Sequence, residues 1–176
     1  GVTDFYQGTE LWELTLVDPD NRRKIDFDLR KKYLKEINSS KNKSGYFEKL
    51  VKNRTDGKLK MYVIKEILSL KEKKDALYQK GNYIPVEVKG KYRESIVAFL
   101  RNYMGDWILV VVPRILNAVG GGKHLPIGEK IWENTYIEIP DFVQGESVDF
   151  ISKKNYNFKE KISIGEIFDK YPGAVF

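Results

Sequence analysis

Residues 96–112 read IVAFLRNYMGDWILVVV, and this stretch is the clearest fold signal in the chain. Two continuous apolar runs, residues 96–100 and 108–112, are rich in β-branched and aliphatic side chains, which is typical of buried strands. Gly105-Asp106 is a turn signal between the two runs. The stretch therefore predicts two central strands joined by a turn.

The same pattern continues on both sides of this stretch. Residues 83–88 and 136–139 alternate apolar with polar side chains, which predicts half-buried strands. Turn residues separate the segments, and short strands at this spacing predict an antiparallel β-sandwich over residues 81–176. We expect Trp107 and Trp132 to belong to its core rather than to a ligand site.

Helical spacing dominates residues 1–80. Asp26 can cap a first helix, Ser44 can begin a short second one, and a third is expected from Gly57 to about Tyr78, before a stop at Gly81. The apolar positions of the third helix form a broad stripe: Leu59, Met61, Val63, Ile64, Ile67, Leu68 and Leu70. The predicted fold class is therefore α+β, with helices followed by antiparallel strands.

Composition excludes several classes of chemistry. The 176 residues contain no Cys and one His, His124, which excludes disulfide frameworks, cysteine nucleophiles and Cys/His metal sites. The longest apolar run, residues 107–113, is far shorter than the roughly 20 residues of a membrane-spanning helix, so no membrane partner is expected. The lack of Cys and of a charged leader predicts a cytoplasmic protein.

The net charge of +6 has two interpretations. It is compatible with an anionic partner, but interspersed pairs such as Lys65-Glu66 are more typical of solvated helix faces. Gly120-Gly121-Gly122-Lys123 lacks the first Gly and the final Ser or Thr of a phosphate-binding loop. No nucleic-acid recognition motif is present, so no nucleic-acid partner is expected. Abundant Lys without Cys is also typical of thermophilic proteins.

The opening residues, GVTDFYQGTELW and then VDPDNRR at 17–23, contain the candidate functional groups. They place an aromatic ring, amides, carboxylates and guanidinium groups in one irregular stretch. Such groups suit a sugar, because an aromatic face covers the apolar side of a sugar ring while Asp, Asn and Arg bond its hydroxyls. Structural turns use several of the same residue types, so residue types alone leave both interpretations open.

The order of these residues resembles the segment after the eighth strand in the α-amylase superfamily, which includes glycoside hydrolase family 13. The pattern there is Gly-x-Pro-x-x-Tyr-x-Gly-x-Glu; Gly1, Tyr6, Gly8 and Glu10 match it, and Thr3 replaces the Pro. The longer form more narrowly resembles the malto-oligosyltrehalose synthase family. Segments that fall in that family's order are DGKLK at 56–60, VVVPR at 110–114, LPIG at 125–128 and the terminal residues 166–176.

The resemblance implies a (β/α)8 barrel enzyme with its active site on loops at the carboxyl face of the strands. Residues 1–80 would be the end of that barrel, with the loop after its eighth strand and an insertion, and residues 81–176 a C-terminal β-domain. The implied reaction is an isomerisation in trehalose biosynthesis that turns the reducing-end α-1,4 link of a maltodextrin into an α,α-1,1 link. It needs no cofactor.

The resemblance also implies that the catalytic carboxylates lie upstream of Gly1, on an amino-terminal barrel portion that acts as partner. This chain would then supply no catalytic residue and would be inactive alone. The expected substrate contacts are Tyr6 as a ring platform and the polar residues Asp18, Asp20, Asn21, Arg22 and Arg23. Gln7, Gly8 and Glu10 are expected to brace the loop.

Three alternatives stay open from sequence. All of these residues can serve only as loop scaffolding. The chain can instead be a stand-alone carbohydrate-binding module, which needs no further polypeptide to bind maltodextrin. It can also be a basic nucleic-acid-binding protein, which predicts salt-sensitive retention of DNA or RNA.

Overall fold

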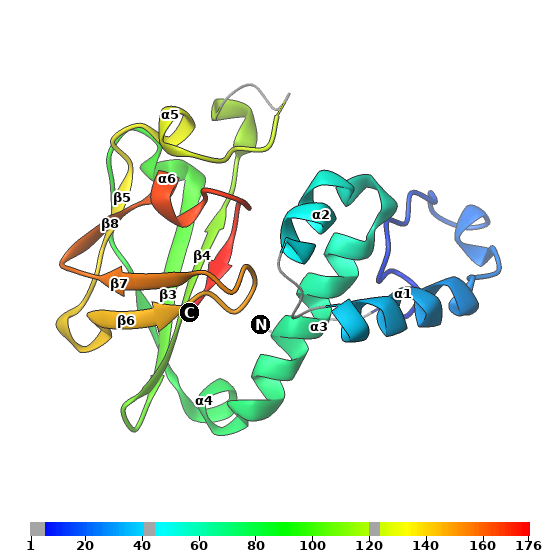
Figure 1. The fold of residues 1–176 in the computed structure, drawn as a ribbon, viewed down its shortest axis with the longest axis horizontal. Coiled ribbons are helices and arrows are strands. Elements are labelled where there is room, and N and C mark those ends of the chain that lie inside the picture. Colours follow the sequence, from blue (N-terminus) through cyan, green and yellow to red (C-terminus); the bar gives the residue numbers. More distant parts are fainter. Residues whose placement is uncertain (1–5, 41–44, 120–123) are drawn as a thin grey trace. The chain divides into compact units, whose positions relative to one another are not determined.

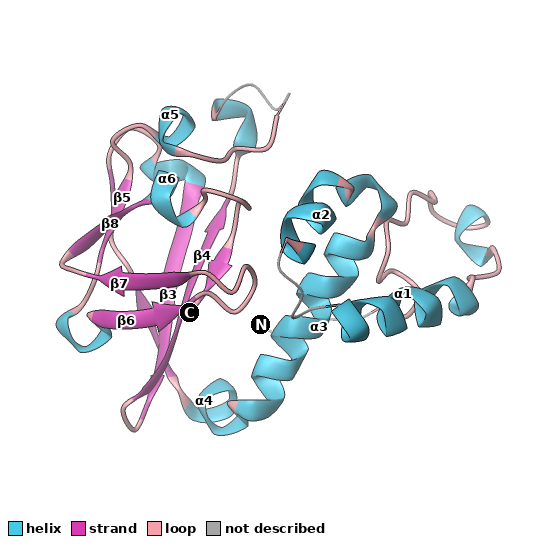
Figure 2. Cartoon of the chain, viewed as in Figure 1, coloured by secondary structure: helices cyan, strands magenta, loops and turns pink. Residues whose placement is uncertain are grey.

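The computed structural model describes residues 6–40, 45–119 and 124–176 and divides into two compact units (Figure 1). The first unit ends at Leu68 and is helical, and the second runs from Ser69 to Phe176 and is built mainly of strands (Figure 2). The expected start of a helix at Ser44, the glycine cluster 120–123 and the motif residues 1–5 lie outside the described residues.

The first unit consists of the loop up to residue 26 and the helices that follow it. These are the 3-10 helix η1 (Asp20–Arg22), α1 (Phe27–Ser40), α2 (Tyr46–Lys52), the 3-10 helix η2 (Arg54–Asp56) and the first part of α3 (Lys58–Lys73). The predicted cap of α1 is confirmed, because the Leu29 N–H donates to Asp26 Oδ1 at 2.8 Å. The buried apolar side chains are Leu11, Ile37, Tyr46, Phe47, Leu50, Leu59, Met61 and Tyr62.

The expected single helix from Gly57 to Tyr78 is wrong in one respect. α3 ends at Lys73, and a separate helix α4 spans Asp75–Lys80. Lys74 lies between them with φ −113° and ψ 31°, and its Nζ pairs with the Asp106 carboxylate, a contact that is remote in sequence. No Pro or Gly stands at this point, so the sequence carries no signal for the break.

The predicted helix stop at Gly81 is confirmed. α4 ends at Lys80, and the Gly81 N–H donates to the Leu77 carbonyl at 2.9 Å. A Cβ on Gly81 would lie 2.4 Å from that same oxygen, so only glycine fits here. The Arg101 guanidinium adds a charge at this helix end, since its Nη2 donates to the Tyr78 carbonyl at 2.9 Å.

The second unit contains the predicted central hairpin. β3 (Ile96–Tyr103) and β4 (Asp106–Pro113) pair antiparallel in a register that runs from Ile96 opposite Pro113 to Tyr103 opposite Asp106. β1 (Asn82–Pro85) flanks β3, and β9 (Ala174–Val175) flanks β4, which gives the sheet order β1-β3-β4-β9.

Two smaller antiparallel sheets complete the described strands of this unit. β2 (Val88–Lys89), β5 (Tyr136–Glu138) and β8 (Lys161–Ser163) form one, and β6 (Gly145–Val148) and β7 (Asn155–Phe158) form the other. Residues 83–88 thus divide between two sheets rather than forming one strand. Short helices connect the strands: η3 (Arg93–Ser95), η4 (Leu116–Ala118), α5 (Glu129–Trp132), η6 (Asp141–Val143) and α6 (Ile164–Ile167).

All three sheets contribute to one hydrophobic core. Trp132 is fully buried in it, and its Nε1–H donates to the Pro126 carbonyl at 2.7 Å. The core assignment of Trp132 is confirmed, although it lies on α5 and not on a strand. Trp107, half-buried on β4, packs against the same core. The α+β class is confirmed, whereas the sandwich and the barrel end stay predictions.

Among the helices of residues 6–40, 45–119 and 124–176, none combines the length and the hydropathy that crossing a bilayer requires.

A buried carboxylate ties the end of the chain to the turn after β6. Asp149 is 2% exposed, and its Oδ1 accepts from the Val175 N–H at 2.9 Å and the Ile151 N–H at 3.1 Å. Its Oδ2 accepts from the backbone N–H of Ser152 at 2.8 Å and from the hydroxyl of that residue at 2.5 Å. Four donors therefore converge on one side chain that water does not reach.

Asp149→Asn should destabilise the second unit by about 2–4 kcal/mol, because an amide nitrogen cannot accept from these donors and leaves buried N–H groups unpaired. Guanidinium unfolding followed by tryptophan fluorescence reports the effect through buried Trp132. Asp141→Asn is the matched control, since Asp141 is exposed, and it should change stability by less than about 0.5 kcal/mol. Equal effects of both substitutions would contradict the role of Asp149.

Candidate functional site

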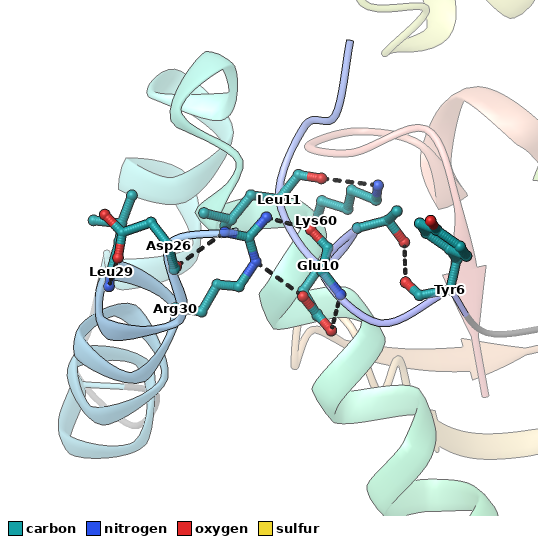
Figure 3. A network of polar contacts seen from close by, with 9 residues as sticks. Tyr6, Glu10, Leu11, Asp26, Leu29, Arg30 and Lys60 are labelled. Carbon is teal, nitrogen blue, oxygen red and sulfur yellow. Dashed lines mark hydrogen bonds and ion pairs between the residues drawn. The ribbon is translucent and has the colours of Figure 1, made fainter. Parts of the chain in front are cut away.

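The loop before α1 presents Tyr6 at its outer end, with 62% of that residue exposed (Figure 3). Thr9 closes a turn that begins at Tyr6, because its N–H and its hydroxyl donate to the Tyr6 carbonyl at 3.2 and 2.7 Å. The exposed ring therefore stands on a hydrogen-bonded turn.

Arg30 on α1 fastens this loop from inside the unit. Its Nε donates to Glu10 Oε2 at 3.0 Å, its Nη1 to the Asp26 carbonyl at 3.0 Å, and its Nη2 to the Gly8 carbonyl. Glu10 Oε1 in turn accepts the Gly8 N–H at 3.1 Å. We call Arg30, Glu10 and Gly8 the Arg30 clamp; its contacts agree with the expectation that Glu10 and Gly8 brace the loop, which stays a prediction.

Glu10 is held as a carboxylate. Burial opposes its ionisation, but hydrogen bonds from the N–H groups of Gly8 and Glu10 and from Arg30 outweigh burial and lower the pKa of Glu10 below its ordinary value of 4.5. Glu10 therefore carries a full negative charge against Arg30 at neutral pH.

Gly8 has a steric reason to be glycine. Its φ is +101°, and a Cβ would lie 2.1 Å from Ile25 Cδ1, at the far end of the same loop. The loop thus returns on itself at this point, which brings residues near 8 and residues near 25 together.

A second set of contacts anchors the loop beyond Glu10. Lys60 Nζ on α3 donates to the Leu11 carbonyl at 3.0 Å, and the Trp12 Nε1–H donates to the Arg54 carbonyl at 2.7 Å. Lys60 also lies 5.4 Å from the centre of the Trp12 ring, a cation–π contact. Leu11 is buried between these anchors.

The polar residues around η1 bond mainly to one another. Arg22 Nη2 donates to Asp18 Oδ2 at 2.9 Å, and Arg23 Nη2 donates to Asp20 Oδ2 at 3.1 Å. Asp20 Oδ2 also accepts the Leu16 N–H at 2.8 Å. These pairs are exposed, so each contributes little to stability, but together they shape the turn.

A cavity of about 170 Å³ opens within this loop. Residues that line it are Tyr6, Gly8, Thr9, Glu13, Thr15, Asn21, Arg23, Lys24 and Ile25. Three of the expected contact residues, Tyr6, Asn21 and Arg23, are thus brought together. Within the described part of the chain, the lining does not include the expected contacts Asp18, Asp20 and Arg22, and Gln7 is exposed outside it.

Sequence reasoning missed the side chains that hold and complete this cavity. Glu13 lines it, and the hydrogen bond from the Thr15 N–H at 3.0 Å lowers the pKa of Glu13. Arg30 was missed although a signal existed, because it precedes Tyr33, Leu34 and Ile37 at the spacing of one helix face. A lone arginine on an apolar stripe indicates a buried acidic or carbonyl partner.

Comparisons with known proteins identify the relatives of this chain. Curated proteins of two Mycobacterium tuberculosis strains, CDC 1551 / Oshkosh and H37Rv, are each 32% identical over 141 residues. Both are named as maltooligosyl trehalose synthases. This chain is homologous to the carboxyl-terminal portion of maltooligosyltrehalose synthases. The match covers 80% of this chain and 14% of each relative, so the chain spans about a seventh of the relatives' length.

Solved maltooligosyltrehalose synthase structures agree with this result. A point mutant of the Arthrobacter ramosus enzyme superposes with a TM-score of 0.69 at 25% identity, over 97% of this chain and 19% of that chain. The unmutated enzyme superposes in the same way, with a TM-score of 0.68 at 24% identity. The scan against protein-family models finds no match. The curated relatives and the solved structures together confirm the resemblance to the malto-oligosyltrehalose synthase family.

Acidification should weaken the first unit through Glu10. A lowered pKa in the folded state means that the stabilisation is complete above pH 4.5 and is lost as the pH falls through the folded-state pKa of Glu10. Guanidinium unfolding followed by the amide signals of residues 6–25 in the ¹⁵N-labelled chain, from about pH 6 to about pH 3, should show this loss. Glu10→Gln should remove that part of the pH dependence, and an unchanged pH dependence in the variant would contradict the clamp.

Proposed function

We propose that the chain is part of a maltooligosyltrehalose synthase and forms a section of the rim around its maltodextrin site. The observation that carries the proposal is the 32% identity to relatives of this name over 80% of the chain. The order of Tyr6, Gly8 and Glu10 in the loop agrees with it. In relatives of this name, the corresponding portion is a small part of a much longer polypeptide.

The proposed reaction moves the reducing-end glucose of a maltodextrin from an α-1,4 to an α,α-1,1 link. A carboxylate attacks the sugar and forms a glycosyl intermediate, while a second carboxyl group acts first as acid and then as base. The released glucose turns and attacks through its anomeric hydroxyl in place of water. Holding that glucose and excluding water separates isomerisation from hydrolysis.

Within this reaction we assign binding, not bond breaking, to the chain. Tyr6 offers an exposed aromatic face to the apolar side of a sugar ring. Asn21 and Arg23 line the same cavity and can bond hydroxyl groups. Asp18, Asp20 and Arg22 are proposed to act mainly through the shape of the turn, since they pair with neighbouring residues.

The residues that line the cavity support the proposal that the catalytic carboxylates belong to another polypeptide segment. A retaining double displacement needs two carboxyl groups about 5–5.5 Å apart. Among the described residues that line the cavity, Glu13 is the only carboxylate. We therefore propose that an amino-terminal barrel portion, in the α-amylase superfamily and of glycoside hydrolase family 13, supplies them. The cytoplasmic location stays a prediction.

The isolated chain should be inert toward maltopentaose. Incubation followed by chromatography of the products should yield neither a trehalose-ended sugar nor free glucose, because the proposal assigns both reacting carboxylates to the amino-terminal barrel portion. The Arthrobacter ramosus maltooligosyltrehalose synthase, assayed in parallel, is the positive control for the conditions. Turnover by the isolated chain above the rate without protein would contradict the proposal.

A further inference from the structure

Arg30 occupies a position where a cation is costly. It lies on the face of α1 that carries half-buried Tyr33 and buried Ile37, and its side chain is only 12% exposed. A charge that is largely removed from water must be compensated by good hydrogen bonds and an opposite charge. The sequence therefore keeps a long charged side chain where an apolar one would pack without such a requirement.

The partners of Arg30 lie in two parts of the chain, the start of its own helix and the loop about 20 residues earlier. One nitrogen bonds the Asp26 carbonyl at the start of its own helix, while the other two bond Glu10 and the Gly8 carbonyl in the loop. A planar guanidinium makes all three bonds in one fixed geometry, which a lysine ammonium cannot reproduce. Arg30 thus sets where residues 8–10 lie relative to α1.

The clamp is directly connected to the exposed ring. Gly8 lines the cavity and donates its N–H to Glu10, and the next residue, Thr9, donates twice to the Tyr6 carbonyl. Displacement of residues 8–10 therefore moves the turn on which Tyr6 stands. The positive charge of Arg30 also acts on Glu13 at another part of the cavity wall.

We propose that Arg30 is a positioning residue for sugar binding: by holding Gly8 and Glu10, it fixes Tyr6 and the cavity wall in the arrangement that accepts a sugar ring. The gain is preorganisation, since a loop already in its bound geometry loses less conformational freedom on binding. The choice of a sugar as the ligand rests on the proposed function. The hydrogen bonds of the Arg30 clamp do not depend on it.

The test is a titration of the ¹⁵N-labelled chain with maltopentaose, followed by the amide shifts of residues 6–25. Arg30→Gln should weaken binding about tenfold, and Arg30→Lys nearly as much, because neither side chain restores the three bonds. Tyr6→Ala should abolish the shifts. Lys58→Gln is the matched control, since Lys58 is similarly buried at 19% exposure and pairs with Glu36 at 3.1 Å in the same unit but outside the loop.

The affinity of the control decides between positioning and general stabilisation. Binding by Lys58→Gln within about twofold of the unmodified chain supports the proposal when Arg30→Gln is weakened. Equal weakening of the two variants would overturn it, because Arg30 would then act only through the stability of the unit. Unchanged binding by Arg30→Gln would also overturn it.

A sugar-free measurement separates this inference from the proposed function. Hydrogen exchange at the Gly8 and Thr9 amides should be faster in Arg30→Gln than in Lys58→Gln, since of the two side chains it is Arg30 that bonds the Gly8 carbonyl and Glu10, the acceptor of the Gly8 N–H. If the unmodified chain shows no shifts with maltopentaose, the proposed sugar site fails while the exchange rates still test the clamp. Equal exchange in both variants would overturn the clamp whatever the titration shows.

Discussion

The loop at the start of the chain is shaped by the need to neutralise a buried guanidinium. Arg30 lies on the inward face of α1, and the loop supplies the Glu10 carboxylate and the Gly8 carbonyl that compensate its charge. These bonds are possible only because the loop folds back on itself at Gly8, where a side chain would collide with Ile25. Tyr6, the Thr9 turn and the cavity follow from that constraint.

The sequence predicted the features that depend on neighbouring residues. The β3–β4 hairpin, the Asp26 cap and the stop at Gly81 each carry their signal within a few positions, and all three are present. The break at Lys74 is not marked by a Pro or Gly, and the division of residues 83–88 between two sheets depends on partners distant in sequence. Periodicity does not report such partners, so these features required the structure.

The residues of the candidate site also fall into those that the sequence predicted and those that required the structure. Tyr6, Asn21 and Arg23 were expected from their order along the chain and do line one cavity. Glu13 and Thr15 carry no pattern of their own and join the wall only because the loop turns at Gly8 and again at η1. The second unit has a hydrophobic core and the buried Asp149, and neither depends on the loop motif.

If maltodextrin binds at the loop held by Arg30, a spin-labelled maltopentaose must bind there too. Bound label broadens the amide signals near it, so we expect losses at Tyr6, Thr9, Thr15, Asn21 and Lys24. An open groove of about 540 Å³ beside β6 and β7, which includes Glu146 and Asn157, provides an internal comparison. Broadening centred on that groove, with the loop signals unaffected, would show that the Arg30 loop is not the sugar site.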